Sequence, residues 1–213
     1  MSIAYLLGKS TSQALKTKIN IPLLMVLSII PDIDILYDFV THSQIHRGPT
    51  HSAIFAAVIF IPFFIYYRKT ALPYFFALVS HSLIGDFFIG GQIKLFWPVS
   101  SKLFGFHESG FYYINIFNPV NIALEIALFA SAALILYKTR DWKYFLNGNT
   151  TNLILIIPIT TVLLPSTIGY PFTESLLFSA PILALAHIGY LLLFTAATLK
   201  SLIRLHKPLL KKG

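Results

Sequence analysis

The sequence contains no cysteine and little charge. Without cysteine, a disulfide framework and a thiolate metal site are both excluded. Only 11% of the 213 residues are Asp, Glu, Lys or Arg, whereas a soluble domain has about 25%. Hydrophobic residues make up 56% of the chain, and they recur in runs of about 20, the length that crosses a bilayer as a helix. We therefore predict an all-α, polytopic transmembrane helical bundle.

Six apolar runs predict about six membrane segments. The expected number is given as five or six because two of the runs are short and contain or adjoin proline. Their approximate ranges are 19–40, 52–67, 71–89, 119–137, 152–168 and 176–199. No internal repeat or separate soluble domain is evident. Residues 1–213 are thus expected to form one integral membrane domain, with a metal-site half over about 1–130 and C-terminal helices over about 131–213. Before the first segment, Met1 to Lys18 is predicted to be a short amphipathic helix on the membrane surface.

The basic residues predict the orientation of the chain. The formal net charge is +8, but these residues flank apolar segments instead of forming one patch, so no nucleic-acid partner is expected. If the N-terminus is cytoplasmic, the inner side holds all of the 16 Lys and Arg residues except Arg47, Lys94 and Lys102. Both termini should then face the cytoplasm of a prokaryotic cell, as in a multi-pass inner or plasma membrane protein. The same arrangement puts every acidic residue except Asp141 on the outer side.

Acidic and imidazole side chains recur within three short stretches of this apolar sequence. The candidate metal ligands are Asp32, Asp34, His46, His51, His81 and Asp86. Ionisable groups at membrane depth are costly unless they are paired, and a divalent cation would neutralise the carboxylates. Asp and His together suit Zn, with Mn or Fe as alternatives. The pattern predicts a site for one or two metal ions on the extracytoplasmic side.

Each stretch also has a simpler interpretation. Pro31 predicts a break in the first segment, after which Asp32 or Asp34 could cap a helix instead of binding an ion. Thr50 is expected to be the N-cap of a helix that opens at His51.

The spacing of His81 and Asp86 raises a separate question. Residues five apart lie about 140° apart on an α-helix, so a shared ion requires a bend, for which Gly85 is the candidate. Alternatively, Asp86 orients a ligand histidine through its other ring nitrogen.

Other polar residues have candidate catalytic roles. Arg47 could contact an anionic oxygen of a substrate or simply extend to the lipid headgroups. Asp38 and Glu125 are the candidate proton acceptors. His107 and Glu108 fit either a site or ordinary loop surface.

The order of these motifs resembles the YdjM-like family of LexA-regulated, inner-membrane, metal-dependent hydrolases. The resemblance covers roughly residues 1 to 130, and it rests on Pro31-Asp32-Ile33-Asp34, His46-Arg47-Gly48-Pro49-Thr50-His51-Ser52, His81 through Asp86, and Phe96-Trp97-Pro98-Val99-Ser100. It implies a bacterial or archaeal integral membrane hydrolase that uses a divalent metal. Two features depart from the family pattern. Ile3 to Gly8 has no histidine where relatives often carry one, and the spacing from His81 to Asp86 is one residue longer than usual.

The sequence as a whole predicts a membrane-embedded, metal-dependent hydrolase. A metal centre at the bilayer edge with a nearby arginine suits a phosphoester, and its position suits a membrane lipid or a lipid-linked substrate. The alternatives are a cation or proton transporter, whose titratable residues would line a path across the membrane, and a non-enzymatic protein with a structural metal. The sequence does not specify an oligomeric state.

Overall fold

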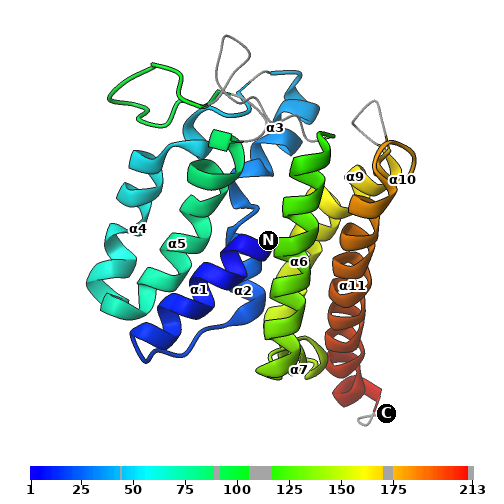
Figure 1. The fold of residues 1–213 in the computed structure, drawn as a ribbon. Coiled ribbons are helices and arrows are strands. Elements are labelled where there is room, and N and C mark those ends of the chain that lie inside the picture. Colours follow the sequence, from blue (N-terminus) through cyan, green and yellow to red (C-terminus); the bar gives the residue numbers. More distant parts are fainter. Residues whose placement is uncertain (44, 89–91, 106–116, 170–174, 211–213) are drawn as a thin grey trace.

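The computed structural model describes residues 1–43, 45–88, 92–105, 117–169 and 175–210 (Figure 1). Among these residues the regular structure is helical, with no strand, which confirms the predicted all-α fold. Many large apolar side chains on the long helices are exposed, including Val58, Ile61 and Ile65 on one helix. Such surfaces are expected where helices face lipid.

The helices follow one another in this order. Those before residue 89 are α1 (Ser2–Ala14), α2 (Ile21–Leu27), η1 (Ile30–Asp32), α3 (Ile33–Thr41), η2 (Pro49–His51), α4 (Ala53–Tyr67), η3 (Arg68–Ala71), α5 (Leu72–Ser80) and η4 (His81–Asp86). Those after it are α6 (Pro119–Lys138), α7 (Trp142–Leu146), η5 (Thr150–Leu155), α8 (Ile156–Pro158), η6 (Ile159–Leu163), α9 (Leu164–Ile168), α10 (Leu176–Ser179) and α11 (Pro181–Leu210).

Four helical stretches within the described residues are long and apolar enough to cross a membrane. They are Ala53–Asp86, Pro119–Lys138, Thr150–Ile168 and Pro181–His206. The first comprises α4 and α5, which lie side by side and are joined at η3 (Figure 1). Each of the four overlaps a predicted segment, and the first, with its two helices, overlaps the two predicted segments 52–67 and 71–89. The membrane character of the chain is confirmed, and the count of five or six segments stays a prediction.

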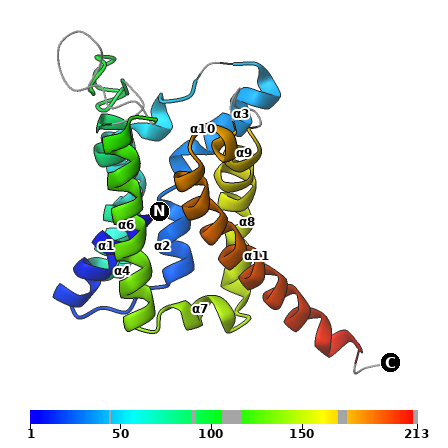
Figure 2. The ribbon, with the colours of Figure 1, turned by 45° about the vertical axis from the view of Figure 1, so that its right-hand side comes forward.

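The predicted first segment, 19–40, is not among these stretches because it is divided. The Asn20 side chain accepts a hydrogen bond from the backbone N–H of Leu23 and so caps α2, which already ends at Leu27. Pro31 lies in the 3-10 turn η1, where a residue without an N–H fits better than inside an α-helix. The break directs α3 along the end of the bundle where α9 and α10 meet, opposite the end with α7 (Figure 2).

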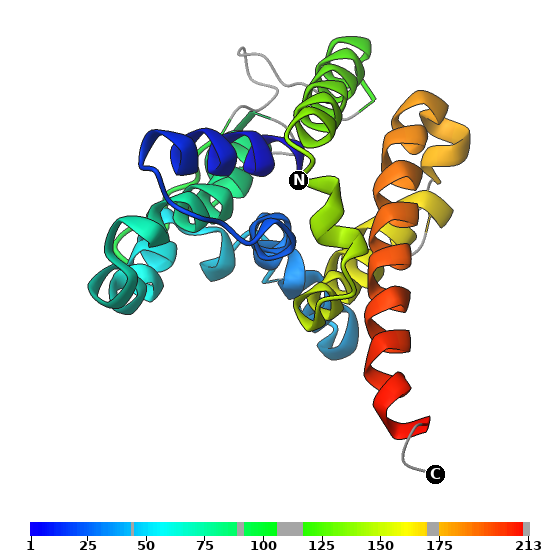
Figure 3. The ribbon, with the colours of Figure 1, turned by 90° about the horizontal axis from the view of Figure 1, so that it is seen from below.

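One face of α1, which the sequence predicts to be a helix on the membrane surface, packs against the bundle. It lies across α2 and α5 (Figure 3), and its Tyr5 side chain is fully buried. A Cβ atom at Gly8 would lie 2.5 Å from the Cδ atoms of Leu24, so only glycine lets α1 approach α2 this closely.

Asp141 connects α1 to the second half of the chain. Its Oδ2 atom lies 2.6 Å from Lys9 Nζ and accepts a hydrogen bond of 2.8 Å from the Tyr5 hydroxyl. The carboxylate is buried, and a buried charge is tolerated when it is paired and hydrogen-bonded. This network explains why one acidic residue lies on the basic side of the protein.

Candidate metal centre

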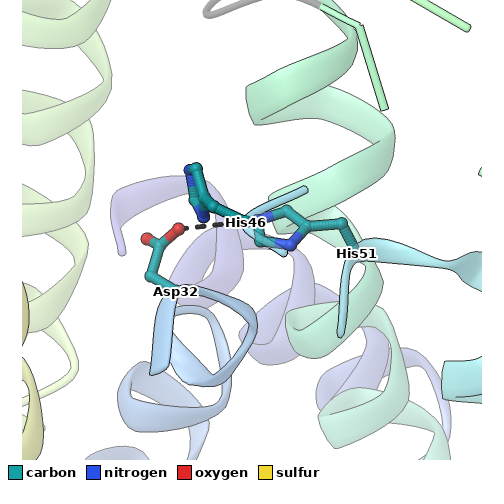
Figure 4. Close-up of side chains that lie close together, drawn as sticks. All are labelled: Asp32, His46 and His51. Carbon is teal, nitrogen blue, oxygen red and sulfur yellow. Dashed lines mark ion pairs between the residues drawn. The ribbon is translucent and has the colours of Figure 1, made fainter. Parts of the chain in front are cut away.

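Five of the predicted ligands converge from three parts of the chain. Asp32 ends η1, His46 lies in the loop after α3, His51 ends η2, and His81 and Asp86 begin and end η4. The side chains of Asp32, His46 and His51 point toward one another (Figure 4). The structure therefore brings together residues up to 54 positions apart at the break between α2 and α3.

Four nitrogen–oxygen contacts join two imidazoles of this cluster to two carboxylates. Asp32 Oδ1 lies 3.5 Å from His51 Nε2 and 3.1 Å from His81 Nε2. Asp86 Oδ2 lies 3.4 Å and 3.2 Å from the same two nitrogens. Zinc bonds of about 2.0–2.1 Å in a tetrahedron give neighbouring ligand atoms a separation of about 3.3–3.4 Å. The four distances are close to that separation, and His51, His81 and Asp86 offer ligand atoms that all lie within 4.8 Å of one another. Imidazole and carboxylate donors suit zinc.

Three of these four atoms are buried and make no hydrogen bond. They are His51 Nε2, His81 Nε2 and Asp86 Oδ2. A buried polar atom without a partner costs about 1–3 kcal/mol, so native proteins rarely keep several together. A cation at their common centre would satisfy all three, and the donor set therefore fits a divalent metal ion.

The other ring nitrogens of the two histidines are fixed by hydrogen bonds. His81 Nδ1 lies 2.9 Å from the backbone oxygen of Ser28, which can only accept. His51 Nδ1 lies 3.0 Å from Thr50 Oγ1, whose hydroxyl donates to Asp34 Oδ2 over 2.6 Å. Both Nδ1 atoms therefore carry a proton, so the neutral form of each imidazole is the tautomer whose Nε2 can bind a metal ion.

Asp34 lies behind the imidazoles and not among the four facing atoms. Its Oδ1 is 2.8 Å from His46 Nδ1, and its Oδ2 is 3.5 Å from His51 Nδ1. Burial alone would raise the pKa of this carboxyl, but its contacts with His46, His51 and Thr50 hold that pKa well below the usual range. Asp34, a predicted ligand, is thus an ionised carboxylate that accepts hydrogen bonds and can orient the rings of His46 and His51.

His46 lies at the rim of the cluster. With Asp32 and His51 it forms a second group of potential ligand atoms, all within 4.8 Å of one another. Its ring meets that of His51 edge-on, at 5.1 Å between centroids, and its side chain is 32% exposed. His46 is therefore the accessible imidazole at the open side of the centre.

The distance between His81 and Asp86 is short because η4 is a π-helical turn. In such a turn the N–H bonds to the carbonyl five residues earlier, so residues five apart come onto one side. The closeness for which a bend was expected therefore comes from this wider turn instead. A Cβ at Gly85 would meet no atom within 4 Å, so no close approach requires glycine there.

Thr50 has a different role from the predicted N-cap. Ser52 caps α4 by accepting from the backbone N–H of Phe55, and it also donates to the carbonyl of Trp97 over 2.6 Å. Thr50 instead connects Asp34 to His51. The signal in the sequence was a hydroxyl residue directly before a candidate ligand, which fits an orienting group as well as a cap.

Asp38, one of the two candidate proton acceptors, shapes the loop that carries His46. Its carboxylate accepts hydrogen bonds from Ser43 Oγ, at 2.6 Å, and from the backbone N–H groups of Ile45 and His46, at 3.0 and 2.8 Å. The Ser43 hydrogen bond is the main cause of a lowered pKa for this carboxyl. Asp38 thus fixes the backbone of Ile45 and His46 to the end of α3.

Arg47 and Glu125, the remaining candidate catalytic residues, lie at different places. Arg47 follows the candidate ligand His46 in the sequence, and its buried Nε has no hydrogen-bond partner among the described residues. Glu125 is on α6, and no hydrogen bond or ion pair between described residues joins it to the cluster. His107 and Glu108 lie outside the described residues.

Searches among curated proteins and among solved structures gave no match to this chain. The model of the family described as YdjM inner membrane protein matches residues 1–164, which include every residue of the cluster. With its long apolar helices, the chain is a multi-pass protein of the cell membrane, and it belongs to the YdjM inner membrane protein family.

Proposed function

We propose that this protein is a membrane-embedded, metal-dependent hydrolase that acts on a phosphoester or lipid-linked substrate. The observation that carries the proposal is the group of His51, His81 and Asp86, whose potential ligand atoms all lie within 4.8 Å of one another. Three of these atoms, His51 Nε2, His81 Nε2 and Asp86 Oδ2, are buried and have no hydrogen-bond partner among the described residues. Three protein ligands leave a fourth position of an ion for water, as in catalytic zinc sites. A zinc ion is the proposed occupant, with manganese or iron as alternatives.

The proposed chemistry divides between the ion and the chain. An ion held there would supply a water whose pKa is lowered to about 7 and would polarise the scissile group. The hydrogen bonds to the Nδ1 atoms of His51 and His81 keep their Nε2 lone pairs directed at the centre. Arg47, with its unpartnered Nε, is the proposed donor to a phosphate oxygen. His46, the exposed imidazole at the rim, is the proposed group that accepts or delivers a proton.

We further infer that the centre faces the extracytoplasmic side and that the C-terminus is cytoplasmic, whereas the N-terminus lies partway along the bundle (Figure 1). The cluster lies at the α3 end of the bundle (Figure 1). The turn with Arg68 and Lys69 and the segment with Arg140 and Lys143 lie at the opposite end, around η3 and α7. Basic residues concentrate on the cytoplasmic side of membrane proteins, which supports this orientation.

Metal analysis and hydrolysis assays together test the proposal. The detergent-purified protein should contain one divalent ion per chain. It should cleave a soluble phosphodiester or a phospholipid, lose activity with a chelator and regain it with zinc, manganese or iron. His81→Ala and His51→Ala should each remove both the ion and the activity. A stable ion without any hydrolysis would favour a structural metal, and zinc uptake into proteoliposomes would favour a transporter. Activity that survives in a His51→Ala/His81→Ala variant would refute the proposal.

A further inference from the structure

The short helix α3 has two chemically different faces. Four of its residues recur at the spacing i, i+3, i+4 and i+7 and therefore share one face: Ile33, Leu36, Tyr37 and Val40. They are between 42% and 74% exposed. The charged residues of the helix, which are both aspartates, do not lie on this face. α3 therefore presents an apolar face that the described parts of the chain leave largely uncovered.

A different face of α3 contacts the metal centre. Asp34 and Asp38 are four residues apart and so lie on one side of the helix. Asp34 accepts a hydrogen bond from Thr50 Oγ1 and lies 2.8 Å from His46 Nδ1. Asp38 accepts hydrogen bonds from the backbone N–H groups of Ile45 and His46. One face of α3 is thus occupied by the cluster and its loop, which leaves the apolar face for a contact outside the chain.

The apolar face continues a surface that belongs to a membrane-spanning stretch. Ile33 lines an apolar groove together with Leu23 and Leu27 of α2 and Ile59 of α4. Leu23 and Ile59 are themselves 38% and 45% exposed. α4 is part of a stretch that is long and apolar enough to cross a membrane, and exposed apolar residues on such helices face lipid. Lipid that surrounds α4 therefore reaches Ile33 and the face that this residue shares with the rest of α3.

The position of α3 is that of a membrane boundary. α3 lies at the end of the bundle where the spanning stretches Pro119–Lys138 and Pro181–His206 begin and where Thr150–Ile168 ends (Figure 2). A helix with one apolar and one polar face typically lies in the membrane interface, with its apolar side chains about 5–10 Å into the boundary between headgroups and acyl chains. In water, by contrast, proteins rarely expose a large contiguous apolar patch. Both the location and the composition of the face suit lipid.

We propose that α3 is an interfacial helix, whose apolar face lies in the lipid of the leaflet on the side of the metal centre. Because Asp34 and Asp38 connect the other face to the cluster and its loop, this contact holds the centre at the depth of the lipid headgroups. The inference goes beyond the proposed function, since it requires neither a bound ion nor a reaction.

Spin labels on single cysteines test the position of α3. The chain has no cysteine of its own, so each variant carries one nitroxide on the full-length protein, reconstituted in phosphatidylcholine vesicles. Val40→Cys and Tyr37→Cys report the apolar face. Ile65→Cys on α4 is the lipid-facing control, because Ile65 and Val40 are both 74% exposed. Thr41→Cys, also exposed and next to Val40, is the control for the polar face. Electron paramagnetic resonance measures collisions of each label with oxygen, which concentrates in lipid, and with a water-soluble nickel chelate.

We expect the oxygen-to-nickel collision ratio of Val40→Cys and Tyr37→Cys to approach that of Ile65→Cys and to be several-fold higher than that of Thr41→Cys. Ratios as low as that of Thr41→Cys would show water on this face and overturn the proposal. Low collision rates with both reagents would show that protein covers the face, and magnetic broadening between labels would identify a second copy of the chain; either result also overturns it. Size-exclusion elution verifies that the variants fold, and Leu36→Cys on the same face replaces one that does not. Hydrolysis is not measured, so failure of this inference leaves the proposed function to its own test.

Discussion

Replacing Asp34 by Asn tests whether this carboxylate orients the ligands or binds the ion. The carboxylate accepts from Thr50 Oγ1 at 2.6 Å and lies 2.8 Å from His46 Nδ1. An amide has nearly the same shape, but one of its two positions is an NH₂ group that cannot accept. The variant therefore loses one of these two contacts and the negative charge behind both imidazoles, while the four facing atoms remain.

The expected effect on metal affinity is intermediate. Loss of a group that orients a ligand histidine weakens metal binding about 10- to 100-fold, which is about 1.4–2.7 kcal/mol. Loss of a ligand such as His81 should instead abolish stoichiometric binding. Asp34→Asn should therefore still bind one zinc ion per chain, with a Kd about 10- to 100-fold higher than that of the wild type.

Competition against a chelating dye at fixed pH, with the protein in detergent, measures this Kd. The matched control is Asp141→Asn, which makes the same chemical change at another buried aspartate, paired with Lys9 on the opposite side of the protein. The control should lower thermal stability but keep the wild-type Kd. Wild-type affinity in Asp34→Asn would show that the carboxylate does not orient the centre. Loss of stoichiometric binding would make Asp34 a ligand, and either result refutes the reasoning.

Three further predictions follow from single contacts. Thr50→Val removes the hydroxyl between Asp34 and His51; one lost hydrogen bond of about 1 kcal/mol should raise the zinc Kd about fivefold in the same assay, and an unchanged Kd would contradict that link. Gly8→Ala forces a Cβ against Leu24 and should lower the free energy of unfolding by about 1–3 kcal/mol. In a double-mutant cycle, Leu24→Ala should reduce this loss. The control Gly85→Ala, whose Cβ would meet no atom within 4 Å, should leave the free energy of unfolding unchanged. Tyr5→Phe removes the hydrogen bond to Asp141 and should cost about 1 kcal/mol in denaturant titrations without changing the zinc Kd; a weaker zinc affinity would show that this network reaches the centre.

Two acidic residues beside the break at η1 take different positions in the cluster. Asp32 faces His51 and His81, while Asp34 contacts the other side of His46 and His51. This short segment thus carries both a candidate ligand and a carboxylate that contacts two imidazoles.

The residue types and their order were sufficient to predict the broad features of this protein. Low charge and long apolar runs predict membrane helices because burial of apolar surface dominates such segments, and four long apolar stretches are present. Likewise, Asp and His residues in apolar sequence predict a common cation site because isolated charges are costly there. Asp32, His46, His51, His81 and Asp86 are indeed close together.

Tertiary structure decided which atom of each residue faces the centre. On an α-helix, His81 and Asp86 would lie on different faces. The π-helical turn brings His81 Nε2 to 3.2 Å from Asp86 Oδ2. The role of Asp34 behind the imidazoles and the role of Thr50 depend on the position of η2 relative to α3, segments joined by a loop that leaves no periodic signal. Similarly, the close approach of Gly8 to Leu24 packs one face of α1 against α2, a contact that the sequence of α1 alone does not specify. The spacing of residues in the sequence predicts which of them share a face of one helix, whereas these contacts depend on how separate helices pack.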